Sequence, residues 1–434
     1  MSMADQSAPQ KSFKLSMLLY DTRYRSLTIQ VIFLIIFMAA AAWLVNNTIQ
    51  NLAALGKDFD FGFLTQRAGY DINQMLVEYS NNSTHARAML IGLLNTLLVA
   101  FLGCITATII GVIAGVLRLS KNWIVARLMT VYIETFRNIP VLLWIIVIMA
   151  IMTEAMPQPR DFRGEDPAAT MKLGDSVAIT NRGVYIPRIG FERSLGGNND
   201  AALLAEGATQ EEVDALPPPS AFTDWLLIIV VFGASIYAVN YNTKRATHIQ
   251  ETTGLRPNTW HVNLALIIVP VAVVMFALGA TVVNPYLKGF NFTEGMHLRN
   301  SLISLWLALS IYTGAFIAEN VRAGIMAINK GQSEAAFALG IRPSRTMRLV
   351  ILPQAMRVIV PPLISQYLNL TKNSSLAIAV GYMDLRATLG GITLNQTGRE
   401  LEAMLLMMLI YLVISLLISS VMNFYNTRTQ LRER

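Results

Sequence analysis

Eight long apolar segments separated by polar loops constrain this chain more than any other feature of its sequence. Each is long enough to cross a bilayer as an α-helix, which needs roughly 17 to 25 apolar residues. A helix also satisfies every backbone polar group within its own segment. The pattern predicts an all-α polytopic membrane protein with about eight transmembrane helices. The segments are 28–45, 89–117, 132–152, 222–240, 261–283, 298–320, 355–380 and 401–425.

The composition fits a membrane protein. Hydrophobic residues make up 54% of the chain and charged residues only 14%, whereas about a quarter of residues are charged in soluble domains. The net charge of +7 comes from basic residues in loops between apolar segments, so we expect no nucleic-acid partner. Cys104 is the single cysteine, which excludes an intrachain disulfide, and the four histidines have no metal-ligand spacing.

Lysine and arginine are unevenly distributed among the loops. They are frequent in 1–27, 118–131, 241–260, 321–357 and 426–434, and sparser in 46–88, 284–299 and 382–400. Cytoplasmic loops of membrane proteins carry the excess of basic residues. Both termini are therefore predicted to be cytoplasmic. The segment 153–222 exceeds the length of about 60 residues beyond which charge has little influence on translocation, so it does not bear on the orientation.

One loop on the predicted cytoplasmic side has a distinctive pattern, "GQSEAAFALGIRPSRTMRLVILPQ" at 331–354. Ser333 is suited to cap a short helix with Glu334 in its first turn, and Gly340 to end it in the left-handed conformation. Pro343 suits the first turn of a second short helix that ends near Pro353. Arg345 is one of several arginines around these helices. An amphipathic loop lying on anionic lipid would explain the same basic residues.

The spacing within this loop resembles the EAA loop of bacterial ABC importer permeases. Glu334, Ala335, Ala336 and Gly340 are followed by nine residues and then "VILP", with Val350 where the family has isoleucine. The resemblance implies coupling helices that dock on a separate ATPase subunit. The residues that it assigns to coupling are Glu334, Ala335, Ala336, Gly340, Arg345 and Pro353.

Other segments are similar to the polar amino acid permease family. They include "YIETFRNIPVLLWI", "YTGAFIAENVRAGIMAINKGQSEAAFALG" and "LTKNSSLAIAVGYMDL". The likeness covers about 89–152 and 297–425 and implies a type I ABC importer permease core. The longer members, the general L-amino-acid and glutamate/glutamine/aspartate/asparagine permeases, also have an extra N-terminal helix and a central insertion. Such systems lie in the bacterial inner membrane and contain an ATPase dimer, two permease chains and a periplasmic binding protein.

The resemblance and the apolar segments together predict five regions. Residues 1–88 form a cytoplasmic tail, the first transmembrane helix and a periplasmic loop, and 89–152 form the first part of the permease core. A periplasmic insertion, punctuated by proline and glycine, occupies 153–222. Two additional transmembrane helices and a loop follow in 223–296. The second part of the core is 297–434, and its coupling loop is 331–353.

The energy source is expected to be another subunit. No lysine lies in a G-x-x-x-x-G-K-[ST] context, and the look-alike "LGKDF" at 55–59 lacks the first glycine and the hydroxyl residue. We therefore expect no cofactor in this chain. ATP and magnesium would be bound by the partner ATPase.

Charged residues within apolar segments are candidate transport residues because they are costly in a bilayer. Glu134 and Arg137 are three residues apart, so they share a helical face and could pair. They belong to "ETFRNIP", which the resemblance places in the inner part of the transport path. A structural ion pair between helices is the alternative. Glu319 and Arg322 repeat the spacing at a segment end, where side chains reaching the interface explain them.

A second set of candidates lies in "NLTKNSSLA", within the seventh apolar segment. A polar run in hydrocarbon must face a cavity or another helix. We predict that the cluster lines the substrate path, with Lys372 as the counter-ion of a substrate carboxylate. Hydrogen bonds between helices are the alternative for part of it. The cluster consists of Asn369, Thr371, Lys372, Asn373, Ser374 and Ser375.

Two other classes of protein are alternatives to the importer. An ion-coupled secondary amino acid transporter would need no ATPase, and inverted repeats would favour it. The sequence has no detectable repeat. A membrane enzyme is disfavoured because no nucleophile with a base, paired carboxylates or metal spacing is found, so no catalytic residue is assigned.

Overall fold

The computed structural model describes residues 22–54, 59–164, 166–196 and 221–429. They belong to two compact units, one within residues 1–63 and the other within 64–434. Residues 1–21 of the predicted cytoplasmic tail lie outside the described residues, as do residues 197–220 of the predicted insertion.

The first unit contains one long helix, α2 (Thr22–Ala54), which includes the predicted first transmembrane segment. A short 3-10 turn, η1 (Gly62–Thr65), follows it along the chain. With 33 residues, α2 is long enough to cross a bilayer with some tilt.

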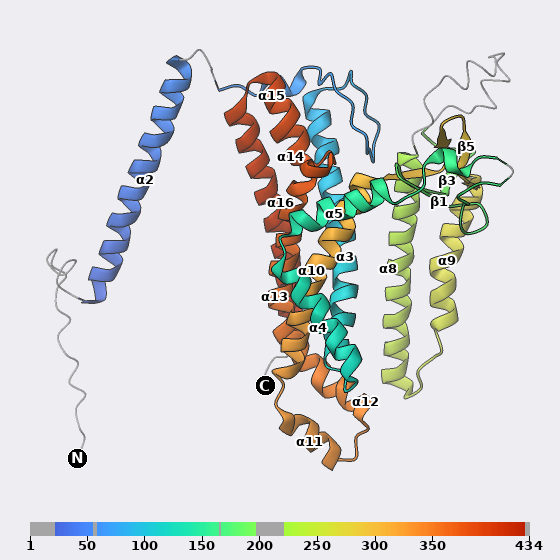
Figure 1. The fold of residues 1–434 in the computed structure, drawn as a ribbon. Helices are drawn as coiled ribbons and strands as arrows, with labels where there is room; N and C mark the ends of the chain where they lie inside the picture. Colours follow the sequence, from blue (N-terminus) through green and yellow to red (C-terminus); the bar gives the residue numbers. More distant parts are fainter. Residues whose placement is uncertain (1–21, 55–58, 165, 197–220, 430–434) are drawn as a thin grey trace, which may run out of the picture. The chain divides into compact units, whose positions relative to one another are not determined.

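The second unit is built from long helices that agree with the predicted segments (Figure 1). The long helices are α3 (His85–Arg118), α4 (Trp123–Asn138), α5 (Val141–Glu154), α8 (Phe222–Thr253), α9 (Trp260–Ala277), α10 (Asn300–Met326), α13 (Leu352–Asn373) and α16 (Glu400–Thr429). The shorter ones are η2 (Pro159–Phe162), α11 (Lys330–Ala338), α12 (Pro343–Thr346), η3 (Met347–Ile351), η4 (Ser374–Val380), α14 (Leu385–Ala387), η5 (Thr388–Thr393) and α15 (Leu394–Thr397). In the described part of the chain, seven helical spans are long and apolar enough to cross a membrane, and the bent pair α4–α5 makes an eighth.

The segment predicted as one span at 132–152 is instead broken. Helices α4 and α5 meet at an angle of 107°. The cause is Pro140, because the residue before a proline is pushed out of the helical region. Ile139 has extended dihedral angles, φ −106° and ψ 132°, and α5 begins directly after Pro140. The elbow divides an apolar stretch that would otherwise read as one helix.

The core of the second unit is the packing of α3 along α10, joined by α5 and α13. Small residues on α3 let the two helix backbones approach closely. A Cβ atom on Gly111 would lie 2.6 Å from the Cβ atom of Ile317. Small residues at helix contacts are typical of membrane bundles, where dispersion contacts drive association.

A small β lobe follows α5. The membrane-spanning part is all-α, as expected, but the strands of this lobe were not predicted. Its strands are β1 (Ala178–Thr180), β2 (Gly183–Ile186), β3 (Arg188–Phe191), β4 (Ala280–Val283), β5 (Tyr286–Lys288), β6 (Asn291–Thr293) and β7 (Met296–Arg299). They form antiparallel pairs in the orders β1-β2-β7, β3-β4 and β5-β6. Strands of the predicted insertion thus pair with strands in residues 280–299, a pairing that was not predicted. Figure 1 shows the lobe at the opposite end of the unit from α11.

Helices α8 and α9 pack against each other as an antiparallel pair. The Asn242 side chain donates a hydrogen bond to Oδ1 of Asn263 at 2.8 Å, which fixes the register of the two helices. Strand β4 continues from the end of α9 and pairs with β3, so the lobe connects this helix pair to the core.

Candidate functional site

The predicted coupling loop has two helical parts, as expected, but its first helix begins earlier. Asn329, rather than Ser333, is the N-cap of α11, and its Oδ1 accepts a hydrogen bond from the Gly331 amide at 2.9 Å. Asparagine is among the strongest capping residues, and here it lies four residues upstream of the predicted cap.

Gly340 ends α11 in the left-handed conformation, with φ +71°. The Gly340 amide donates to the Phe337 carbonyl at 2.9 Å, and the Ile341 amide donates to the Ala336 carbonyl at 3.0 Å. This pair of bonds is the Schellman motif, which satisfies the last helical carbonyls. The predicted role of Gly340 as the bend between the two helices agrees with this geometry.

The second helical part does not end at Pro353, which corrects the expectation. Helix α12 begins at Pro343, passes through the π-helical turn η3 and continues into α13. In that turn the Leu352 amide donates to the Met347 carbonyl, five residues back. Pro353 lies in the first turn of α13, where its missing amide is tolerated. The loop is therefore directly continuous with a membrane helix.

The surface of the coupling loop is largely uncovered. Glu334, Ala335 and Arg345 are exposed, and Ala336 is buried against the rest of the loop. Of the two alanines that the resemblance assigns to coupling, only Ala335 is therefore accessible to a partner. Beside it, the Phe337 and Leu339 side chains are 52% and 79% exposed. Large apolar side chains grouped on an exposed surface are typical of an interface with another protein.

The polar cluster of α13 divides between two sides of the helix. Asn369 and Lys372 are exposed, together with Ser365 one turn earlier. Thr371 and Ser374 are buried, and their hydroxyls donate to the carbonyls of Tyr367 at 2.9 Å and Thr371 at 2.8 Å. Both bonds are local, the kind that serine and threonine make in membrane helices. Ser374 and Ser375 belong to the 3-10 helix η4, which follows α13 directly. Asn373 and Ser375 are half-buried.

Sequence reasoning missed Arg357, which lies on the same helix as Lys372. Its side chain is half-buried, and its Nε has no hydrogen-bond partner among the described residues. Fifteen residues separate Arg357 from Lys372, which places them about 60° apart around the helix axis. The sequence could have identified Arg357 as a candidate transport residue, because it is a charged residue inside the apolar segment 355–380.

The expected pair between Glu134 and Arg137 is not formed. Glu134 pairs instead with Arg118 of α3, at 3.4 Å. Arg118 also pairs with Glu319 of α10, at 2.5 Å, and Glu319 pairs with Arg322 of the same helix. This ionic cluster joins α3, α4 and α10 near the end of the bundle from which α11 extends. Glu319 and Arg322, explained from the sequence by side chains reaching the interface, do form an ion pair at this spacing of three residues.

Arg137 contacts an aromatic ring rather than a carboxylate. Its guanidinium carbon lies 5.3 Å from the centroid of the Phe316 ring on α10, within reach of a cation–π interaction. The side chain is half-buried, and its Nε has no hydrogen-bond partner in the parts of the chain that the structure describes.

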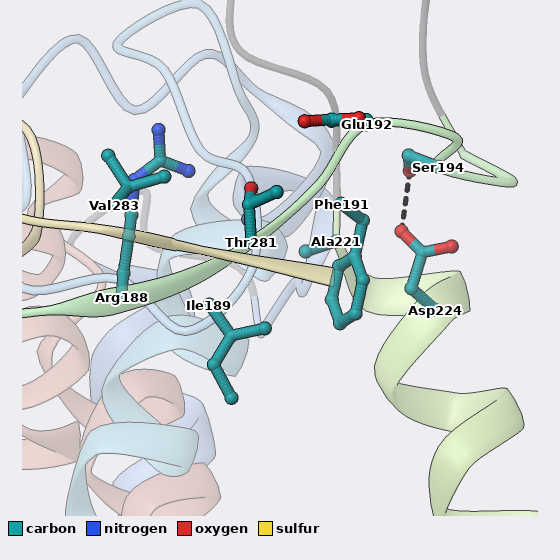
Figure 2. A pocket seen from close by; sticks show the side chains of 10 residues that line it. Arg188, Ile189, Phe191, Glu192, Ser194, Ala221, Asp224, Thr281 and Val283 are labelled. Atoms are coloured by element: carbon teal, nitrogen blue, oxygen red, sulfur yellow. Dashed lines mark hydrogen bonds between the residues drawn. The ribbon is translucent and has the colours of Figure 1, made fainter. Parts of the chain in front are cut away.

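A hollow of about 270 Å³ with polar and apolar lining lies in the β lobe, between the β3–β4 pair and the start of α8. Figure 2 shows Asp224 below Ser194 at one side of it. Asp224 is buried, and its carboxylate accepts hydrogen bonds from the Ser194 hydroxyl and, at 2.8 Å, from the Leu195 amide. These bonds hold the chain after β3 on the end of α8. Arg188, on the opposite side of the hollow, pairs with Glu294 at 2.8 Å.

The chain is similar to known transport proteins over its whole length. The model of the family described as "Binding-protein-dependent transport system inner membrane component" matches residues 257–431. The chain is 56% identical to the glutamate/glutamine/aspartate/asparagine transport system permease protein BztB of Rhodobacter capsulatus, with 98% of each chain covered. It is 42% identical to the general L-amino acid transport system permease protein AapQ of Rhizobium johnstonii, over 98% of this chain and 96% of that one.

A solved structure described as an amino acid ABC transporter with histidines matches with a TM-score of 0.42 and 18% identity, over 79% of this chain and 95% of that one. The identity to full-length relatives decides the classification. This chain belongs to the family of binding-protein-dependent ABC importer permeases.

Proposed function

We propose that this permease carries polar L-amino acids across the bacterial inner membrane, with glutamate, glutamine, aspartate and asparagine or a broader L-amino-acid range as substrates. The observation that carries this proposal is the 56% identity over 98% of the chain to a permease named for those four amino acids. The second full-length relative is named for general L-amino acid transport, which supports the broader range.

The coupling loop, 331–353, is the proposed docking surface for a separate ABC ATPase dimer, which binds ATP and magnesium. The exposed Phe337 and Leu339 provide an apolar contact, and Glu334 and Arg345 provide charges around it. The continuity of α12 with α13 supports a mechanical role. A displacement of the docked loop is passed along one helical run into the membrane, without an intervening flexible joint.

The exposed polar face of α13 is the proposed wall of the substrate path. An exposed lysine and asparagine at membrane depth are costly against lipid, so this face is expected to meet water and a second protein chain. A second permease chain across the path, in a heterodimer, would supply that environment. Lys372 would then counter the substrate carboxylate, and Asn369 and Ser365 would offer hydrogen bonds.

The remaining partner is a periplasmic amino acid binding protein. The β lobe lies at the opposite end of the unit from the coupling loop, so a cytoplasmic loop implies a periplasmic lobe (Figure 1). The excess of basic residues in the loops on the side of 321–357 supports cytoplasmic termini.

The proposal is tested by uptake into proteoliposomes that contain the purified permease pair and its ATPase, with a loaded binding protein on one side. We expect uptake of labelled glutamate or glutamine to need ATP and to persist when ion gradients are collapsed. Uptake driven by an ion gradient without ATP would support the secondary transporter instead.

A further inference from the structure

The elbow between α4 and α5 contains a cation that no described carboxylate neutralises. The ionic cluster beside it pairs two guanidinium groups, those of Arg118 and Arg322, with two carboxylates, those of Glu134 and Glu319, and Arg137 forms no ion pair with either carboxylate. Arg118 and Arg322 use both carboxylates in direct ion pairs. Arg137 contributes only at longer range to the electrostatics of Glu319. One positive charge therefore remains.

Arg137 and the two helices next to it, α5 and α10, contain buried hydrogen-bond donors that lack acceptors in the described part of the chain. Within the described ranges, no acceptor is found for Arg137 Nε, for Nδ2 of Asn320 or for Nε1 of Trp144. Asn320 lies one helical turn beyond Phe316, the ring that the guanidinium covers. Leaving buried donors unpaired costs about 1 to 3 kcal/mol each. A group that only accepts hydrogen bonds would remove that cost.

The position of Arg137 suits a transported ligand. It lies three residues before Pro140, where the span is broken, and broken spans in transporters are frequent substrate sites. The stacked rings of Phe136 and Trp144, with centroids 4.1 Å apart, hold the end of α4 against the first turn of α5. The Phe316 ring holds the guanidinium on α10. Movement of α5 relative to α10 would therefore change the access to Arg137.

We infer that Arg137 is a binding site for a carboxylate of the transported amino acid, at the elbow of the broken span. This inference rests on the proposed function and adds a cation distinct from Lys372. A guanidinium binds a planar carboxylate through two parallel hydrogen bonds. The α-carboxylate and the side-chain carboxylate of glutamate share this chemistry. Glutamine has only the α-carboxylate, so comparing glutamine with glutamate shows which of the two carboxylates binds Arg137.

The experiment measures ATP-driven uptake of labelled glutamate and glutamine in the complete reconstituted complex. Arg137→Met removes the charge and keeps an unbranched side chain. Arg127→Met is the matched control, because it removes an exposed arginine from the same helix. Assembly of the complex and ATPase stimulation by the binding protein are measured on the same samples. Uptake by the unchanged complex is the reference, and its absence would count against the proposed function rather than against this site.

We expect Arg137→Met to lower glutamate uptake about tenfold or more, the effect of losing one charged hydrogen-bonded partner. Assembly and ATPase stimulation should persist, and Arg127→Met should remain within about twofold, as expected for an exposed charge. If Arg137→Met leaves glutamine uptake unchanged, Arg137 binds the side-chain carboxylate of glutamate. If glutamine uptake falls as much as glutamate uptake, Arg137 binds the α-carboxylate.

Arg137→Lys keeps the charge and the fold but not the two parallel hydrogen bonds, so it should raise the KM for glutamate with little change in kcat. Two results would overturn the inference. One is normal uptake of both amino acids by Arg137→Met together with a normal KM for Arg137→Lys. The other is that Arg137→Met and Arg137→Lys each lose both complex assembly and uptake. That result would make Arg137 the partner of a carboxylate in the second permease chain.

Discussion

Gly115 of α3 and Ala318 of α10 lie so close that a Cβ atom on Gly115 would be 2.6 Å from the Ala318 carbonyl oxygen. The contact is with backbone, so it cannot be relieved by turning a side chain. We predict that Gly115→Ala destabilises the permease by about 1 to 3 kcal/mol, the usual cost of overpacking. Denaturant unfolding of the purified protein in detergent measures this loss.

The matched control for this prediction is Gly233→Ala in α8. An added Cβ there has no neighbour within 4 Å, and the backbone is helical. Alanine should therefore leave stability unchanged or improve it by up to about 1 kcal/mol. Equal effects of the two substitutions would show that the α3–α10 approach is not a tight contact.

His297 makes the β lobe sensitive to pH. Its ring stacks on Tyr185 with centroids 4.2 Å apart, and its Nε2 donates to the Arg182 carbonyl at 3.1 Å. Burial lowers the pKa of His297 below its ordinary value of 6.5, and the charge of Arg299 lowers it further, against the opposing effect of the bond to Arg182. His297 is therefore protonated near pH 6.5 in the unfolded lobe but only at lower pH in the folded lobe. The stability of the folded lobe thus falls as the pH drops through 6.5.

Hydrogen exchange measures this effect. We expect peptides that cover β2 and β7 to exchange faster at pH 5 than at pH 7.5, after correction for the intrinsic rate, with peptides from α10 as the internal control. His297→Phe keeps the stacked ring and removes the titration, so its exchange should vary less with pH. If the wild-type lobe is equally protected from hydrogen exchange at both pH values, His297 does not make it sensitive to pH.

Gly340 has a backbone conformation that other residues adopt at a cost of about 1 to 2 kcal/mol. We predict that Gly340→Ala loosens the bend after α11 and lowers the number of amino acids transported per ATP hydrolysed, because φ is +71° there. No atom lies within 4 Å of an added Cβ, so the effect comes from the backbone alone. Gly233→Ala, at a helical position in α8 with no neighbour within 4 Å of an added Cβ, should preserve the transport ratio. If both variants transport the normal number of amino acids per ATP hydrolysed, Gly340 has no role in coupling.

Lys372 lies on the exposed side of α13, and we predict that it contributes to substrate passage. Lys372→Ala should lower the uptake rate by about three- to tenfold, the range expected for losing a partly solvated charged contact. Lys244→Ala removes an exposed lysine from α8 and should have no effect. Unchanged affinity and rate in Lys372→Ala vesicles would exclude the role.

The sequence predicted the membrane segments well because apolar length is a local property. It predicted the left-handed Gly340 for the same reason, since a glycine after a helical run and before Pro343 is a local signal. It missed the elbow at Pro140, where the apolar run continues through the break and only the proline marks it. It also missed the pairing of β2 with β7, because more than 100 residues separate the two strands.

The candidate residues could be named from the sequence, and their roles stay predictions, but their arrangement could not be predicted. The spacing of Glu134 and Arg137 predicted a pair within one helix, and the partner of Glu134 came from another helix, Arg118. Sequence spacing describes neighbours on a helix, whereas ion pairs between helices depend on how those helices cross. The same limit applies to the polar run of α13, whose residues could be named but not assigned to a buried or an exposed side.

The proposed contact between the coupling loop and a separate ATPase can be tested by site-specific photo-cross-linking. A photoreactive phenylalanine analogue at Phe337, which is 52% exposed, should cross-link to the ATPase in the assembled complex. The same analogue at Phe290, exposed in the β lobe, should not. We expect a cross-link from position 337 whose yield changes when ATP binds. An assembled complex that gives no ATPase cross-link from 337, or gives one from 290, would contradict the proposed contact.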